Sequence, residues 1–281
     1  MGNSVVTIAT VNVNGIRAAF RKGMGQWLTA CQPDVLLLQE TRAPQDVVTG
    51  FFPADDGWQV AVHPCAIKGR AGVAVVTKLP ITQSRAGLVA QQLDGSSEPD
   101  VDTGRWLEAD LTMPDGQPLT VVSTYLHSGT NTPELAHTMT AKYHHLDKVE
   151  QRLKELSEYQ HPVVVAGDFN IAHENRDIAN WKGNRDSAGF LPEERAYLTR
   201  WFQQHGWADL GRRHAGEVEG PYTWWSWRGQ AFTNDRGWRI DYQTGNPPAA
   251  AAMRSVIVAR HASYENRWTD HAPVVGEYEF G

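Results

Sequence analysis

Chemically useful side chains follow directly after a short apolar run near the middle of the chain. The run Val163-Val164-Val165-Ala166 ends in Gly167-Asp168-Phe169-Asn170. Residues two apart on extended backbone point to the same side, so the carboxylate of Asp168 and the carboxamide of Asn170 can face one point beyond a strand end. Sites in α/β proteins are commonly built there. The simpler interpretation of this tetrapeptide is an Asx turn, because Gly, Asp and Asn are common turn formers.

Other apolar runs end in the same way, and this favours the chemical interpretation. The residues at these ends are carboxylates, carboxamides, a tyrosine and a histidine: Asn12, Asn14, Glu40, Tyr125, Asp241, Asp270 and His271. Hard oxygen donors suit Mg²⁺ or Mn²⁺ rather than zinc. The sequence contains no Walker phosphate loop, glycine-rich fingerprint or nucleophile elbow. What remains is metal-assisted attack of water on a phosphoester.

The rest of the pattern indicates the elements that hold these side chains. Helices are expected over residues 18–30, from Thr132 to about Glu158, and from Pro192 onward. An acidic stretch rich in Gly, Ser and Pro predicts a surface loop over residues 93–104. The pair Thr244-Gly245 is expected to loosen the end of the strand that precedes it. Apolar and β-branched runs predict strands over residues 5–13, 35–38, 58–62, 72–77, 106–111, 119–125, 163–166, 239–243, 255–258 and 274–280.

The order of these elements predicts an α/β fold. Strands alternate with helices and hairpins, as in mixed sheets covered by helices. Because the sequence contains neither an internal repeat nor a linker, residues 1–281 are expected to form a single domain.

Composition limits the class of protein. Hydrophobic content of 41% and charged content of 21% are those of an ordinary soluble globular protein. No apolar run approaches the roughly 18 residues of a membrane span. The formal net charge of −6 argues against a protein that coats nucleic acid through a basic surface, but it allows an enzyme that contacts a few phosphates. Two cysteines and no visible secretory signal indicate a reducing, cytoplasmic location.

Six polar stretches follow one another along the chain: Asn12-Val13-Asn14-Gly15-Ile16-Arg17-Ala18, Leu38-Gln39-Glu40-Thr41, Gly167-Asp168-Phe169-Asn170, Gly189-Phe190-Leu191-Pro192-Glu193-Glu194-Arg195, Gly237-Trp238-Arg239-Ile240-Asp241-Tyr242 and Thr269-Asp270-His271-Ala272-Pro273. In this order they resemble the motifs of the exonuclease III family of apurinic/apyrimidinic (AP) endonucleases. This family is the DNA-repair branch of the endonuclease/exonuclease/phosphatase superfamily that includes DNase I. The resemblance extends from about Thr7 to Tyr278, and six motifs in register are far more specific than one. It implies a four-layered α/β sandwich, with two packed mixed β-sheets flanked by helices.

The resemblance implies a role for each strand-end residue. Asp168 would orient or deprotonate the attacking water, and Asn170 would hold that water and contact the phosphate. His271 would bind the scissile phosphate as an imidazolium that Asp241 orients and charges, and Tyr125 would donate to a phosphate oxygen. A histidine alone is more often a satisfied core residue, but the neighbouring Asp and the partner Asp favour the charged ring. The Mg²⁺ site, which Mn²⁺ could also fill, would be built from oxygen donors: Glu40 as the principal ligand, helped by Asn12, Asn14 or Asp270.

The resemblance also implies a substrate pocket. Trp224, Trp238 and Ile240 would surround a deoxyribose that lacks its base, although alternating aromatics are more often simply core. The family's phosphate-contacting loop corresponds to Asn180, Asn184 and Arg185. The DNA backbone could also contact four basic residues, each of which taken alone is more often a solvated surface charge: Lys68, Arg70, Arg17 and Arg236. His127, two residues after Tyr125, is a further candidate for a contact with substrate.

The favoured function is a Mg²⁺-dependent DNA-repair phosphodiesterase. It would act as a monomer on double-stranded DNA, cleave 5′ to abasic sites and remove 3′ blocking groups, and it would associate with the nucleoid. Exonuclease activity in the 3′→5′ direction is left open. The alternatives are another phosphodiesterase of the superfamily, acting on undamaged DNA, phosphoinositides or sphingomyelin, and a catalytically silent DNA-binding scaffold. The last would need a lost ligand, and none of the strand-end residues is lost.

Overall fold

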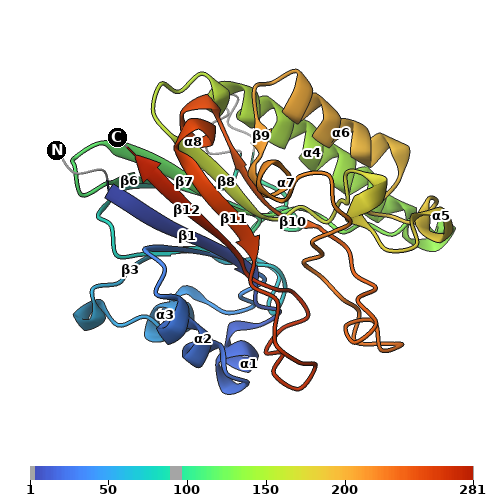
Figure 1. Cartoon of the computed structure of the whole chain (residues 1–281), viewed down its shortest axis with the longest axis horizontal. Coiled ribbons are helices and arrows are strands. Elements are labelled where there is room, and N and C mark those ends of the chain that lie inside the picture. Colours follow the sequence, from blue (N-terminus) through green and yellow to red (C-terminus); the bar gives the residue numbers. More distant parts are fainter. Residues whose placement is uncertain (1–3, 89–96, 281) are drawn as a thin grey trace.

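Two β-sheets lie face to face at the centre of the molecule (Figure 1). The computed structural model describes residues 4–88 and 97–280, and within them each sheet has six strands. The first sheet has the order β11-β12-β1-β2-β4-β3, with β1 (Ser4–Asn12), β2 (Val35–Gln39), β3 (Gln59–His63), β4 (Val73–Thr77), β11 (Met253–Val258) and β12 (Val274–Phe280). The second has the order β5-β6-β7-β8-β10-β9, with β5 (Ile81–Ala86), β6 (Trp106–Thr112), β7 (Pro118–Tyr125), β8 (Val163–Asp168), β9 (Ala208–Asp209) and β10 (Asp241–Gly245).

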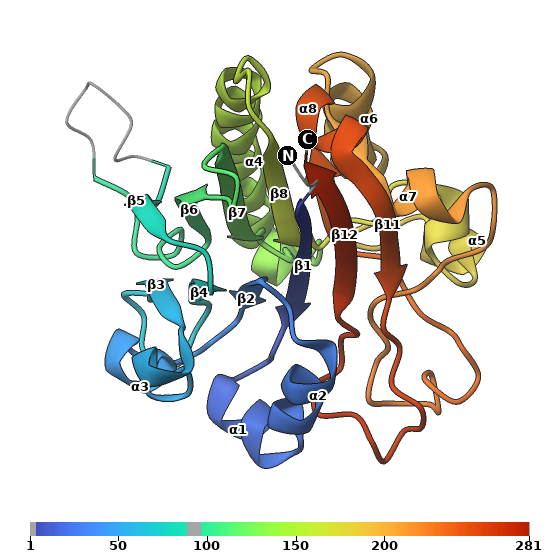
Figure 2. The same cartoon turned by 60° about the vertical axis from the view of Figure 1, so that its left-hand side comes forward.

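Helices cover the outer faces of both sheets (Figure 2). On the second sheet lie α4 (Ala136–Ser157) and α6 (Pro192–Gln203), and on the first lie α1 (Ile16–Arg21), α2 (Met24–Cys31) and α3 (Gln45–Gly50). This arrangement confirms the predicted four-layered sandwich. Shorter pieces are α5 (Trp181–Asn184), α7 (Leu210–Ala215), α8 (Pro247–Ala252), η1 (Ala54–Asp56), η3 (Pro133–Leu135) and η4 (Asn175–Asp177).

Alternating side chains of the strands fill different layers of the core. In β1, Val6 and Ile8 lie between the sheets, whereas Ala9 and Val11 face α1 to α3. Because both faces are covered, a strand such as β2 is apolar almost throughout, and all of its residues are buried. Each large apolar side chain buried in this way stabilises the fold by about 1.5–3 kcal/mol. The polar residues at the strand ends therefore differ from the apolar strand residues that form the core.

Strand register brings those polar ends to one edge of the sandwich. β1 and β2 are parallel, as are β7 and β8, where Tyr125 lies opposite Asp168. β10 runs antiparallel to β8, so its first residue, Asp241, also lies opposite Asp168. In the same way the segment before β12, which contains His271, meets the end of β1. The sheets thus gather residues from distant parts of the chain.

Some local predictions were wrong. Residues 18–30 form two helices, because the chain leaves α1 at Lys22 and Gly23, and glycine is about 1 kcal/mol less favourable than alanine inside a helix. The expected loosening at Thr244-Gly245 is absent: β10 extends through both residues, and Thr244 Oγ1 donates to Val165 O at 2.9 Å. β5 was not predicted, because it is a polar, mostly exposed edge strand.

Two expectations fall partly outside the described residues. Residues 93–96 of the surface loop predicted over residues 93–104 lie outside the described residues. The first three residues of the chain also lie outside them. Among the helices of residues 4–88 and 97–280, none combines the length and apolar character needed to cross a membrane.

Candidate active site

A cavity of about 460 Å³ opens at the edge where the strand ends gather. Strands of both sheets contribute to it, so this active-site cavity lies on the seam between the sheets. Two predicted residues, Asn12 and Asp241, lie buried just beneath it and bond to residues that line it. The predicted residues that line it directly are Asn14, Glu40, Tyr125, Asp168, Asn170, Trp224, Trp238, Ile240, Asp270 and His271.

Three of these residues have unusual backbone conformations. Asn14, Glu40 and Asn170 follow β1, β2 and β8, and their φ angles are 47°, 49° and 51°. Left-handed conformations of this kind cost a non-glycine residue on the order of 1–3 kcal/mol and cluster at functional sites. Asparagine tolerates them better than glutamate does. The fold therefore holds the Glu40 side chain at the cavity against a local conformational cost.

The carboxamide of Asn12 links the two sheets. Its Nδ2 donates to Glu40 Oε1 at 2.8 Å and to Asp168 Oδ2 at 2.9 Å, while its Oδ1 accepts from Asn14 N at 3.0 Å. Asn14 Nδ2 in turn donates to Asp270 Oδ1 at 2.9 Å. Carboxylates from three separate strand ends are thus held together by carboxamide donors.

The buried ion pair of His271 and Asp241 forms another part of the cavity floor. His271 Nδ1 lies 2.8 Å from Asp241 Oδ2, and its Nε2 lies 3.8 Å from Asp168 Oδ2. Burial alone would lower the pKa of His271, but the carboxylates of Asp241 and Asp168 raise it to about 10. The ring is therefore an imidazolium at neutral pH, with Nε2 directed toward Asp168.

Asp168 lies in an environment that makes its proton exchangeable near neutrality. Burial raises the pKa of Asp168 to about 7; the charge of His271 opposes this rise, and Asp241 adds to it. Asn170 N donates to Asp168 Oδ1 at 2.9 Å, which fixes the carboxylate. Beside it, burial and the charges of Glu40 and Asp168 hold the pKa of Tyr125 well above its usual value, so the phenol remains a hydrogen-bond donor.

The donors at the cavity fit a hard divalent cation. Glu40 is 13% exposed in its side chain, and oxygen donors of Asn14, Asp168 and Asp270 also line the cavity. Asp168, Asp241 and His271 present ligand atoms within 4.8 Å of one another. A protonated imidazole does not bind a metal, however, so the carboxylates around Glu40 are the better donors.

Aromatic side chains form one wall of the cavity. The rings of Trp224 and Trp238 meet edge to face, with centroids 6.2 Å apart, and both pack against buried Ile240. Trp224 Nε1 donates to Asp270 Oδ2 at 3.1 Å. An apolar surface therefore stands directly beside the acidic floor.

Other predicted contact residues lie outside the cavity. Asn180, Asn184 and Arg185 are at or next to the short helix α5, and they are not among the described residues that line the cavity. Asn184 Nδ2 donates to Asn180 O at 3.1 Å, and Arg185 is largely exposed. Lys68, Arg70, Arg17 and Arg236 are also exposed. His127 does not line the cavity in the described structure; it is buried and lies 2.8 Å from Asp102 Oδ1, so the expectation that it contacts substrate loses its basis.

The structure adds residues that the sequence did not suggest. Thr223 Oγ1 accepts hydrogen bonds from the backbone N–H groups of Ile240 and Asp241, each at 3.0 Å, and so fixes the start of β10. Arg42 Nε donates to Glu40 Oε2 at 2.9 Å, and a second nitrogen of the same guanidinium bonds to that oxygen. Neither residue has a distinctive sequence signal, although the position of Arg42 two residues after Glu40 could have suggested the contact.

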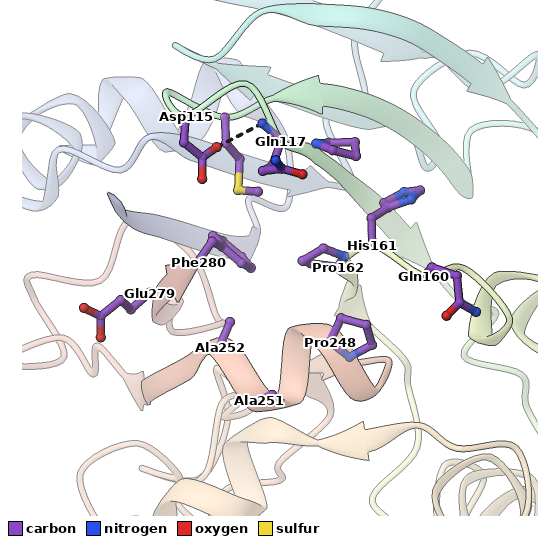
Figure 3. A pocket seen from close by; sticks show the side chains of 12 residues that line it. Asp115, Gln117, Gln160, His161, Pro162, Pro248, Ala251, Ala252, Glu279 and Phe280 are labelled. Atoms are coloured by element: carbon purple, nitrogen blue, oxygen red, sulfur yellow. Dashed lines mark hydrogen bonds between the residues drawn. The ribbon is translucent and has the colours of Figure 1, made fainter. Parts of the chain in front are cut away.

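A second hollow, of about 430 Å³, lies at the other end of the strands (Figure 3). It is lined by Pro118 at the start of β7, Pro162 before β8 and Phe280 at the end of β12. Its carboxylates, Asp115 and Glu279, lie apart on different sides. It lacks the carboxylate, carboxamide and imidazolium cluster of the active-site cavity in the described residues.

Comparison with known proteins agrees with this geometry. The model of the endonuclease/exonuclease/phosphatase family matches residues 9–271. An exodeoxyribonuclease of Bacillus subtilis is 31% identical over 268 residues, which cover 94% of this chain and 95% of the relative.

Solved structures have the same architecture over almost the whole chain. An AP endonuclease from Archaeoglobus fulgidus has a TM-score of 0.80 and 25% identity, covering 97% of this chain and 99% of its own. A 3′ phosphatase from Neisseria, bound to a product DNA hairpin, has a TM-score of 0.78 and 26% identity, covering 98% and 100%. Fold and site thus define a hydrolytic nuclease with an acidic cluster that could hold a metal ion. The chain belongs to the endonuclease/exonuclease/phosphatase family, in the branch of exodeoxyribonuclease III and the AP endonucleases.

Proposed function

We propose that this chain is a Mg²⁺-dependent DNA-repair phosphodiesterase that cleaves double-stranded DNA 5′ to abasic sites. The same centre would remove phosphate and other blocking groups from 3′ ends. The observation that carries this proposal is the aromatic wall of Trp224, Trp238 and Ile240 beside the acidic floor. An apolar wall of this kind would accept a deoxyribose without its base and would disfavour an intact nucleotide. The relatives' activities on DNA, as exodeoxyribonuclease, AP endonuclease and 3′ phosphatase, support it.

In this proposal Asp168 takes a proton from the attacking water. Its pKa of about 7 suits a general base near neutral pH. Asn170, whose Nδ2 donates to Leu126 O at 2.9 Å, presents its amide to the phosphate beside the water. The water oxygen bonds to phosphorus, the bond to the leaving 3′ oxygen breaks, and that oxygen takes up a proton from solvent to become the 3′-hydroxyl.

Cationic and neutral donors would stabilise the transition state. His271 Nε2 carries a positive charge toward the phosphate, and Asp241 keeps the ring charged and oriented. Tyr125, whose raised pKa keeps the phenol protonated, would donate a hydrogen bond to a phosphate oxygen. These groups are fixed before substrate arrives, so little reorganisation is needed as charge develops on phosphorus.

Glu40 would be the principal ligand of the metal, assisted by Asp270, Asn14 or Asn12; of these, Asp270 and Asn14 line the cavity, and Asn12 lies beneath it. The oxygen donors suit Mg²⁺, with Mn²⁺ as a substitute. When bound, the ion neutralises negative charge on the phosphate and polarises it toward attack.

The wider assignments follow from the same site. Asn180, Asn184 and Arg185 would contact DNA phosphates from the rim near α5. We propose that residues 1–281 work as one domain, since the cavity needs both sheets, and that the protein acts as a monomer on DNA. We assign the protein to the cytoplasm, where it would associate with the nucleoid and act on its DNA.

The test compares an abasic duplex with an undamaged duplex and a phosphoinositide. Wild-type protein should cleave the abasic duplex in Mg²⁺ and lose this activity in EDTA. Asp168→Asn should abolish cleavage and still bind abasic DNA, while Asp115→Asn, the same change at the far end of the strands, should behave as wild type. Cleavage of phosphoinositide alone, cleavage in EDTA, or normal cleavage by Asp168→Asn would contradict the proposal.

A further inference from the structure

A fully buried ion pair lies behind the active-site cavity and joins two helices. Lys142 Nζ of α4 is 2.6 Å from Glu194 Oε1 of α6, and both side chains are 0% exposed. Burial lowers the pKa of Lys142, and Glu194 opposes that change. Buried ion pairs contribute little net stability, since well-packed apolar side chains often replace them without loss. The pair therefore calls for an explanation other than stability.

Each member of the pair also holds the backbone of loops that line the cavity. Lys142 Nζ donates to Ser128 O and to Asn170 O, each at 3.0 Å. Glu194 Oε2 accepts from Gly189 N at 2.6 Å and from Leu191 N at 3.0 Å. Ser128, Asn170 and Gly189 all line the cavity. Segments that are far apart in sequence thus meet on one charged pair.

The backbone held in this way faces the aromatic wall at close range. At Gly189, an added β-carbon would lie 3.1 Å from Asn170 O and 3.2 Å from Trp238 Cζ3. The backbone at Gly189 is therefore packed closely against the ring of Trp238, with no room for an added side-chain atom unless a neighbour moves. A small shift of the Gly189 or Asn170 backbone would therefore change the width of the cavity.

Stabilisation of the N-terminus of α6 accounts for Glu194 but not for Lys142. Glu194 completes the N-terminal turn of α6, where a carboxylate is favourable without any lysine. Lys142 takes no part in that turn, and it donates to carbonyl groups of two other loops. Its contacts concern the cavity wall rather than the helix end.

We propose that Lys142 and Glu194 are positioning residues that set the width of the cavity and thereby its selectivity for a base-less sugar. The inference rests on the proposed function, because it concerns the same cavity. Neither residue touches the reacting phosphate. They act through Ser128, Asn170 and Gly189.

Two substrates separate positioning of the sugar from phosphate chemistry. In an abasic duplex the sugar beyond the scissile phosphate enters the cavity. In a duplex ending in a 3′-phosphate no sugar follows that phosphate, so the aromatic side of the cavity stays empty while the phosphate occupies the acidic floor. A change of cavity width should reduce kcat/KM for the abasic duplex by about tenfold or more, because misplacement by about 1 Å can cost on the order of a hundredfold. The 3′-phosphate substrate should lose a smaller factor, which reports the part of the shift that reaches Asn170 beside the phosphate.

The principal variant is Lys142→Met/Glu194→Gln, which removes both charges and keeps an acceptor for the N–H groups of Gly189 and Leu191. Glu194→Gln alone serves as a milder second variant in case the double variant does not fold. The matched control is Arg152→Met, also on α4, which breaks the ion pair with buried Glu108 away from the cavity. All proteins are compared below their melting temperatures.

A selective loss of abasic cleavage in the double variant, or in Glu194→Gln, with weaker binding of a tetrahydrofuran-containing duplex in EDTA, supports the inference. Equal effects on both substrates, or the same shift of the ratio in Arg152→Met, overturn it. If wild-type protein does not cleave abasic duplex at all, the proposed function fails and this inference fails with it. If wild type cleaves and the ratio does not move, the positioning role alone is wrong.

Discussion

Asp241→Asn should abolish the charge on His271 at the pH where the enzyme works. The substitution keeps the shape of the side chain, and the amide oxygen can still accept from Nδ1, so ring orientation is retained. What is lost is the carboxylate that contributes most, together with Asp168 and Asp270, to raising the pKa of His271 to about 10 against the effect of burial. Burial then acts with less opposition, and the pKa should fall toward its usual value.

The magnitude follows from the size of the shift. One pKa unit corresponds to about 1.4 kcal/mol, so the difference between 6.5 and about 10 represents several kcal/mol of preference for the charged ring. At pH 8 a group with a pKa of 6.5 is only about 3% protonated, so a complete return to that value would lower activity roughly thirtyfold relative to wild type. In wild type the pKa of His271 is raised, so the stabilisation from this ion pair is complete below pH 6.5 and is lost as pH rises through about 10.

The assay is the ratio of kcat for the variant and wild type between pH 5.5 and 9 on an abasic duplex. The ratio should be lowest at high pH and recover toward low pH, and the NMR titration of His271 should move down by several units. Asp110→Asn, a carboxylate paired with Arg85 away from the cavity, is the control and should keep the wild-type profile. A pH-independent ratio, or a His271 that still titrates near 10 in the variant, would refute the reasoning.

Other residues give shorter tests. Gly189→Ala adds a β-carbon 3.1 Å from Asn170 O and 3.2 Å from Trp238 Cζ3 at a residue with a φ of 90°, so the loop should shift and abasic cleavage should fall more than 3′-phosphate removal; equal losses in steady-state assays would count against this. Arg42→Met should tighten Mg²⁺ binding in calorimetry, since the guanidinium occupies Glu40 Oε2; unchanged or weaker binding would argue that the two do not compete. Arg239→Met should lower the free energy of unfolding in urea by about 3 kcal/mol, because it removes the guanidinium that pairs with buried Asp177 and with Asp209 and leaves Asp177 only its pair with Arg212; a change below about 1 kcal/mol would contradict that estimate.

The strand ends could be predicted because the signal is local. Apolar runs such as β2 and β8 end abruptly in polar residues, and the structure brings Glu40 and Asp168 to one cavity. The order of strands and helices predicted mixed sheets covered by helices, and the resemblance to the exonuclease III family implied the four layers. The chemical roles of these residues remain predictions that the proposed variants test.

Contacts between distant segments could not be predicted. Lys142 looks like any lysine on an amphipathic helix, and only the packing of α4 against α6 gives it a buried partner. His127 illustrates the opposite case: its position after Tyr125 suggested substrate, yet the fold pairs it with Asp102. The break between α1 and α2 was missed because the apolar period continues across it.

The link formed by Asn12 makes catalysis depend on how the two sheets are stacked. One nitrogen holds Glu40, at the end of a strand in one sheet, and Asp168, at the end of a strand in the other. Asn12 and Glu40 belong to the same sheet, so sliding that sheet past the other by a single residue, about 3.3 Å, would break the contact between Asn12 and Asp168. Substitutions in the core between the sheets should therefore lower catalytic activity even when the protein stays folded, because they change how the sheets stack. The rate of turnover would then report small shifts of one sheet relative to the other.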